Sequence, residues 1–119
     1  MTEPARVSVE LFESETIVAR GRRRVAYWVR YNDGWTPARE HPAASVEQLS
    51  PAPGTVWERR VCLELAVGTR LLYVESAPRP EPARDPLEYL GMQRQGPKRR
   101  STRRELVVGP RGELVRVKP

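Results

Sequence analysis

The sequence predicts a mainly β protein: a small antiparallel β-barrel or sandwich of six to seven strands with one or two short helices, or an α+β variant of it. Several segments alternate apolar and polar residues with a period of two, which is typical of half-buried strands. Short turn signals rich in Gly, Asn, Asp and Pro separate these segments. A chain of 119 residues is expected to form one domain with a real core.

The first third of the chain predicts an antiparallel meander of three strands. Residues 5–13 alternate, and residues 16–20 form a second strand that ends at a tight reversal around Gly21. The third strand, residues 24–31, turns again at the sequence NDG, residues 32–34, since Asp and Gly accept positive φ. One face of this third strand carries Val25, Tyr27, Val29 and Tyr31, and the other carries Arg24, Ala26, Trp28 and Arg30.

The next segment, residues 36–54, contains four prolines. They forbid a central strand there and limit any helix to about one or two turns. Ser45 and Gln48 have the spacing of a capping box, so we expect a short helix over residues 45–49. Two β-like runs follow, residues 55–65 and 69–76, and we expect them to pair as a central hairpin.

The composition changes after residue 77, which divides the single domain into three parts. Residues 1–77 form a β-rich core module, and residues 78–104 form a proline-rich and then arginine-rich connecting segment. Asp85 as N-cap, Pro86 at the first helical position and Gly91 after the end predict a short helix at residues 86–90. Residues 105–119 form a C-terminal hairpin around GPRG that packs on the core.

The positive charge is concentrated in the last part of the chain. Residues 1–77 contain ten basic and ten acidic residues, whereas residues 78–119 contain eleven basic and five acidic ones, so the second part carries the whole net charge of +6. No acid interrupts the cluster that we call the basic run, which consists of Arg94, Lys98, Arg99, Arg100, Arg103 and Arg104. Arginine binds phosphate through two parallel donors, so the run predicts an anion-binding surface.

Two further groups of residues extend this candidate site. Arg22, Arg23 and Arg24 crowd a turn and join the basic run if the fold brings that turn close. Trp28 beside Arg24 and Arg30 is a pattern that can stack an unpaired base. The competing interpretations are a solvated basic loop and a structural Trp28 covered by another part of the chain.

The residues that enzymes and metal sites need are sparse. The chain has one His and one Cys, so the strong zinc spacings and a nucleophilic triad are both missing. We expect His41 to be exposed in a loop, Cys62 to be buried, and the acidic pair Glu13 and Glu15 to be exposed. We therefore predict no catalytic residues, no metal and no cofactor, and a protein that is not an enzyme.

Two functions remain open. The first is a non-enzymatic nucleic-acid-binding protein, with DNA and RNA not distinguished, that uses the basic run for phosphate contacts. The second is an accessory or assembly protein that binds another protein, such as an acidic partner, through its proline-rich segments and strand edges. The sequence has no long apolar run and no leader pattern, so we expect a cytoplasmic protein with no membrane contact.

Overall fold

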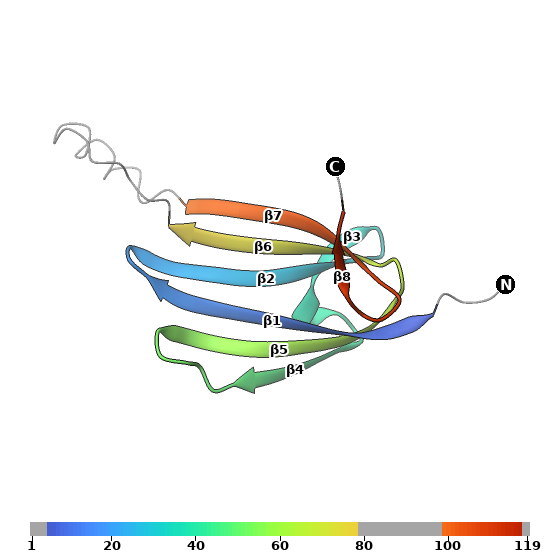
Figure 1. Cartoon of the computed structure of the whole chain (residues 1–119), viewed down its shortest axis with the longest axis horizontal. Helices are drawn as coiled ribbons and strands as arrows, with labels where there is room; N and C mark the ends of the chain where they lie inside the picture. Colours follow the sequence, from blue (N-terminus) through green and yellow to red (C-terminus); the bar gives the residue numbers. More distant parts are fainter. Residues whose placement is uncertain (1–4, 79–98, 118–119) are drawn as a thin grey trace.

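The computed structural model describes residues 5–78 and 99–117, which form one antiparallel sheet curled into an open half-barrel (Figure 1). The strands follow the path β4-β5-β1-β2-β6-β7-β8, and β3 pairs with β2 beside this path. The strands are β1 (Arg6–Val18), β2 (Gly21–Tyr31), β3 (Gly34–Pro37), β4 (Ala44–Leu49), β5 (Thr55–Ala66), β6 (Arg70–Pro78), β7 (Arg99–Val108) and β8 (Leu114–Arg116). The mainly β class is confirmed. The closed barrel or sandwich is wrong, because β4 and β8 end the path without pairing with each other.

The predicted three-strand meander is wrong, because the strands expected at residues 5–13 and 16–20 are the single strand β1, and β1 and β3 both pair with β2. Residues 6–18 are one continuous strand, and β1 pairs with β5 from Arg6 to Thr16. The reversal into β2 therefore lies at Ala19 and Arg20, one step before the predicted Gly21 turn. The NDG turn is confirmed: Asn32 and Asp33 have φ of 50° and 60°, which joins β2 to β3 by a two-residue loop.

The short helix predicted over residues 45–49 is wrong, since these residues belong to strand β4. Val46 lies opposite Val61 of β5, and the ladder hydrogen bonds to β5 replace those of a helix. The only helical turn in the described part of the chain is a 3-10 turn at Ala38–Glu40. No helix in these ranges is long and apolar enough to cross a membrane.

Strands β5 and β6 exist as predicted, but they do not pair with each other. β5 lies between β4 and β1, whereas β6 lies between β2 and β7. The chain crosses from one half of the sheet to the other through the turn at Val67–Thr69. The predicted central hairpin is therefore wrong in its pairing, because β5 pairs with β4 and β1, whereas β6 pairs with β2 and β7.

The C-terminal hairpin is confirmed as β7 and β8, and β7 begins earlier than the sequence indicated. Its first residue is Arg99, so four of the six residues of the basic run lie in a strand that pairs with β6. The loop between β7 and β8 touches the start of β1: a Cβ at Gly112 would lie 2.2 Å from the carbonyl oxygen of Ser8, and its φ is +82°. The helix expected at residues 86–90 lies outside the described residues.

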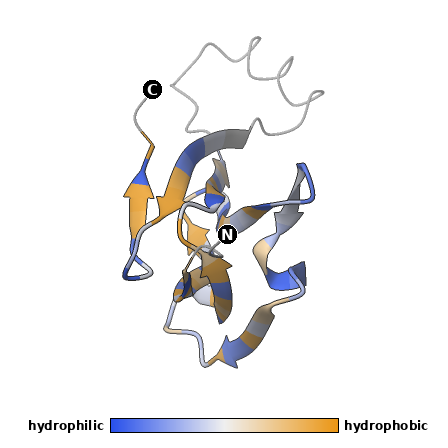
Figure 2. Ribbon diagram, turned by 90° about the vertical axis from the view of Figure 1, so that its right-hand side faces the viewer, coloured by the Kyte–Doolittle hydropathy of each residue, from blue (hydrophilic) through white to orange (hydrophobic). Residues whose placement is uncertain are grey.

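The apolar core gathers at the end of the sheet where β7 meets β8. Its buried members are Val9, Leu11, Val29, Ala38, Val61, Leu63, Leu65, Leu71 and Val108. Figure 2 shows how β7 changes along its length, from hydrophilic at its arginines to hydrophobic where it joins this core. Leu106 and Leu114 pack against the core from β7 and β8. The C-terminal hairpin is thereby anchored on the rest of the sheet.

The inner row of β1 continues from the core into two buried acids. Glu13 is fully buried and Glu15 is 7% exposed, so the expectation that these acids are exposed is wrong. Glu13 Oε1 accepts a hydrogen bond of 2.7 Å from Arg59 Nε, and its Oε2 accepts one of 2.7 Å from the backbone N–H of Tyr27. Both oxygens of this carboxylate are thereby satisfied.

Glu13 closes a gap in the sheet. β1 pairs with β2 only as far as Val25, and β3 takes over the same edge of β2 from Trp28 onward. The N–H of Tyr27 lies between these two ladders, where no strand offers it a carbonyl. The Glu13 carboxylate supplies the missing acceptor.

Candidate nucleic-acid interface

The described part of the basic run lies on strand β7. Arg103 and Arg104 are exposed, and neither forms an ion pair with a carboxylate of residues 5–78 or 99–117. Glu105, the nearest acid in the strand, bonds instead to Arg70, with 3.0 Å between Nη1 and Oε1. For Arg99 and Arg100 only the backbone positions in β7 are described. Arg94 and Lys98 lie outside the described residues.

The fold brings the basic turn of β2 close to the start of β7. Arg24 lies opposite Ser76 of β6, and Ser76 lies opposite Ser101 of β7, so the three residues form one row across the sheet. Two strand spacings separate β2 from β7, which is about 10 Å. The hairpin tip packs closely on β6, because a Cβ at Gly21 would lie 2.8 Å from Cγ of Pro78.

Two of the three arginines at this turn are engaged by Glu15. Arg24 bonds Glu15 Oε1 through Nη2 at 2.9 Å and through Nε at 3.2 Å, and Arg22 Nη1 lies 3.4 Å from Oε2. The side chains of Arg22 and Arg24 remain 58% and 60% exposed, respectively. The hydrogen bond from Arg24 is the main reason that the pKa of Glu15 is lowered, against the opposing effect of its burial. The cluster keeps a net positive charge.

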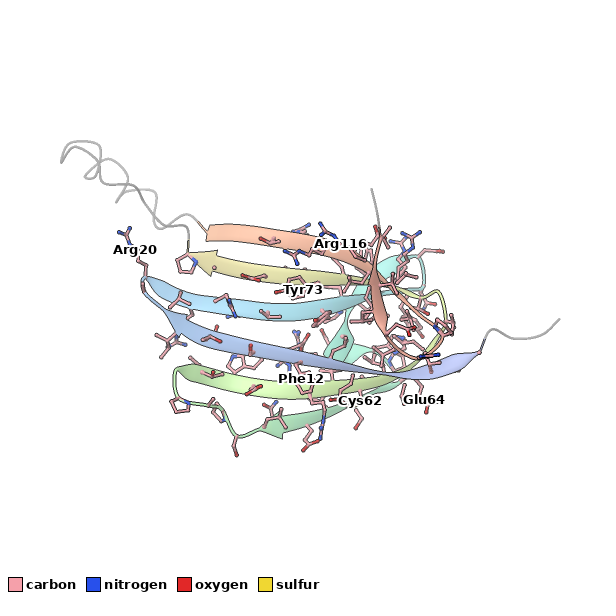
Figure 3. The ribbon with its side chains drawn as sticks, viewed as in Figure 1. Phe12, Arg20, Cys62, Glu64, Tyr73 and Arg116 are labelled. Carbon is pink, nitrogen blue, oxygen red and sulfur yellow. The ribbon has the colours of Figure 1, made fainter. Side chains whose placement is uncertain are left out.

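Arg20 and Arg23 add to this end of the sheet. Arg20 lies at the exposed turn between β1 and β2, and its labelled side chain points away from the hairpin tip (Figure 3). Sequence reasoning missed Arg20, although it stands two residues before Arg22. Arg23 is exposed, and its positive charge acts on Tyr73 of β6, where it opposes the rise in the pKa of that phenol.

A pair of tyrosines lies between the two groups of arginines. Tyr27 of β2 is directly opposite Tyr73 of β6, and their rings meet edge to face with centroids 5.5 Å apart. Tyr73 in turn lies opposite Arg104 of β7, so the three side chains share one face of the sheet. Burial and a hydrogen bond to Glu75 raise the pKa of Tyr73 to about 12. The sequence pattern alone did not single out these tyrosines, because the row exists only once the strands are paired.

Trp28 and Arg30 lie further along β2 than the arginines of the basic turn. Trp28 is half-buried and stands between Pro37 of β3 and Leu72 of β6. The Arg30 guanidinium lies over the ring of Trp35, 5.5 Å from its centroid. Arg30 is six residues along β2 from Arg24, which is about 20 Å in a strand. Arg30 is therefore far from Arg24, whereas Trp28 lies in the row that ends at Glu105 of β7, two residues from Arg103.

His41 and Cys62 are the remaining residues that the sequence analysis singled out. The described residues contain no group of three or more His, Cys, Asp and Glu side chains that could hold a metal ion. Cys62 is half-buried, not fully buried as predicted. His41 is also half-buried, so its predicted exposure is wrong: its ring packs on Tyr31 and its Nδ1 accepts a hydrogen bond from the N–H of Ala43 at 3.0 Å. Burial is the main cause that lowers the pKa of His41.

The geometry thus gathers several exposed arginines and two tyrosines on neighbouring strands at one end of an open sheet. No protein-family model, curated protein or solved structure matches the chain significantly. The function has to be argued from the residues of this chain.

Proposed function

We propose that this protein binds nucleic acid through the arginines of β7 and of the β1–β2 hairpin. The observation that carries the proposal is the strand order β2-β6-β7, which places Arg103 and Arg104 on the strand next but one to Arg23. Arg103 and Arg104 are exposed and have no carboxylate partner among the described residues, and arginines in this state attract phosphates and release counterions when they bind them.

The open side of β7 leaves room for such a ligand. β8 pairs only with Leu106, Val107 and Val108, so among the described residues no strand covers the outer edge of β7 from Arg99 to Arg104. Charged side chains on an exposed edge also prevent strand-to-strand aggregation, which is the structural alternative. Measurable affinity for a polyanion distinguishes binding from this protective role.

The test is a binding titration with labelled DNA and RNA oligonucleotides across a range of salt concentrations. The variant Arg103→Gln/Arg104→Gln should bind more weakly than the wild type at about 50 mM salt, and the log–log salt slope should become shallower by about one for each of these arginines that contacts a phosphate. The control Arg39→Gln/Arg60→Gln removes the same charge from residues that pair with Glu40 and Glu47 elsewhere in the fold, and its slope should stay close to that of the wild type. Wild-type protein that binds neither polymer at this salt would overturn the proposal.

A second candidate is an assembly protein that accepts a strand from an acidic partner. The observation in its favour is that the sheet is open: β4 pairs only with β5, and the arginine-bearing part of β7 pairs only with β6 within the described ranges. Backbone pairing to such an edge should survive about 0.5 M salt, whereas phosphate contacts should not. Co-purified nucleic acid, or instead a salt-resistant protein partner, separates the two candidates.

A further inference from the structure

Tyr73 is held in place from two sides. Its hydroxyl donates a hydrogen bond of 2.7 Å to Oε2 of Glu75, two residues along the same strand. The ring of Tyr27 meets it at an interplanar angle of 66° and is itself packed against the apolar core. A side chain with both its ring and its hydroxyl fixed loses little conformational entropy when a ligand binds to it.

Two arginines lie on the same face of the sheet as this ring. Arg104 is its direct neighbour on β7, and Arg23 acts on it electrostatically from β2. The side chains of Arg103 and Arg104 point to opposite faces of the sheet, because successive residues of a strand alternate. A ligand on the tyrosine face therefore meets Arg104 and Arg23 but not Arg103, which limits the number of phosphates that this face can bind.

We infer that Tyr73 is a stacking platform for an unpaired base of single-stranded nucleic acid, whose backbone Arg104 and Arg23 bind on either side. This inference rests on the proposed function and narrows its substrate. A duplex keeps its base faces stacked on one another, so only a single strand can offer a base to an aromatic ring. Duplex binding would use the arginines without the tyrosine.

Glu75 adds a base preference to this platform. Its Oε1 has no hydrogen-bond partner among the described residues, while its Oε2 accepts from Tyr73. A carboxylate accepts a hydrogen bond from the exocyclic amino group of cytosine, whereas thymine presents a carbonyl oxygen at the same position. A base stacked on Tyr73 should therefore be cytosine in preference to thymine.

The experiment measures fluorescence anisotropy of labelled oligo(dC), oligo(dT) and a duplex of the same length at about 50 mM salt. Tyr73→Leu keeps an apolar side chain in the strand but removes the aromatic face, and it should weaken oligo(dC) binding about tenfold while duplex binding stays unchanged. Tyr73→Phe should restore most of the lost affinity. The control Tyr31→Leu removes an exposed tyrosine at the far end of β2 and should have no effect.

Glu75→Gln tests the base preference separately. The amide can rotate to donate to the thymine carbonyl, so the ratio of oligo(dC) to oligo(dT) affinity should move toward one. An unchanged ratio would overturn the role of Glu75.

The failures of the two proposals are distinguishable. If the wild type binds duplex and single strands equally, and Tyr73→Leu changes neither, the stacking inference is wrong and the proposed function stands. If the wild type binds no oligonucleotide at all, both the proposed function and the stacking inference are wrong. Equal losses with Tyr73→Leu and Tyr73→Phe would also overturn stacking, because the ring would then have no part in binding.

Discussion

The two halves of strand β1 are built alike and stabilised differently. In the first half Val9 and Leu11 are 1% exposed and pack among aliphatic side chains, whereas in the second half Glu13 and Glu15 are buried against arginines. Burial of aliphatic groups is favourable by itself, but burial of a carboxylate is tolerated only where donors satisfy it. The same strand geometry thus supports an apolar core at one end and a polar cluster at the other.

This difference has a consequence for the candidate interface. The apolar end of the sheet fixes where the strands lie, and the polar end presents exposed arginines around Glu15 and along β7. Arg22 and Arg24 are held in place by Glu15 while more than half of each side chain stays exposed. Oriented cations of this kind can bind an anion without first being ordered.

The largest expected loss of stability comes from replacing Glu13, the fully buried acid in the polar half of β1. Glu13→Ala leaves the Arg59 guanidinium, whose side chain is 16% exposed, without its carboxylate and leaves the Tyr27 N–H without an acceptor. We expect the free energy of unfolding, measured by urea titration, to fall by about 3–5 kcal/mol. The double variant Glu13→Leu/Arg59→Met should lose less than Glu13→Ala, because no unpaired charge remains buried. Equal losses would show that the ion pair is not the cause.

A cavity in the apolar half of β1 should lower the free energy of unfolding slightly less than the loss of Glu13 does. Leu11→Ala removes methyl groups from a site that is 1% exposed and leaves a cavity beside Val61, its partner on β5. The free energy of unfolding should fall by about 3 kcal/mol in the same urea titration. The control Phe12→Ala removes a larger side chain that is 49% exposed and should cost much less.

Alkaline pH should remove the stability that Tyr73 contributes on the neighbouring strand β6. The pKa of Tyr73 is raised to about 12, so the folded state favours the neutral phenol more than the unfolded chain does. This contribution to stability is complete below the unfolded pKa of about 10 and is lost as the pH rises toward about 12. The thermal midpoint should fall over that window, and Tyr73→Phe should reduce the fall. A fall of the same size in that variant would contradict the assignment.

Acidic pH should also lower stability, through Glu15 in the polar half of β1. The hydrogen bond from Arg24 is the main cause that lowers the pKa of Glu15, so this carboxylate contributes stability that is present above its unfolded pKa of about 4.3. That contribution is lost as the pH falls through the lower pKa of the folded state. Glu15→Gln should therefore show a smaller loss of thermal midpoint below about pH 4 than the wild type does.

The smallest effect is expected for an ion pair outside both halves. Glu47 on the edge strand β4 pairs with Arg60 of β5, and its side chain is 58% exposed. Solvent screens such pairs, so Glu47→Gln should leave the urea midpoint unchanged within error. A loss comparable to that of Glu13→Ala would mean that exposure does not separate the two kinds of ion pair.

Local patterns predicted the strands well and their partners poorly. The alternation around Val7, Val9 and Leu11 and the NDG turn are properties of a few neighbouring residues, and the structure contains both. The helix expected over residues 45–49 is a strand, because the ladder to β5 outweighs the local signal of a capping box. The start of β7 was missed, since its arginines show no hydrophobic periodicity and are defined as a strand by pairing with β6.

The alternating sequence pattern could have predicted the burial of Glu13 and Glu15. Both follow Leu11 at intervals of two, so the alternation places them in the buried row. Their charge favoured exposure instead, and the sequence has no local sign of the arginines that satisfy them. Arg59 is 46 residues away from Glu13, and the two meet only because β1 and β5 pair.

The sequence by itself determined the class of this protein, the surplus of positive charge in its last part, and the shortage of His and Cys for metal or nucleophilic chemistry. Tertiary structure decided the open half-barrel, the burial of the two acids, and the row that joins Tyr27, Tyr73 and Arg104. The physical reason is that alternation and turn preference depend on neighbouring residues, whereas strand order depends on contacts between distant segments. A surface shared by β2, β6 and β7 exists only after those contacts form.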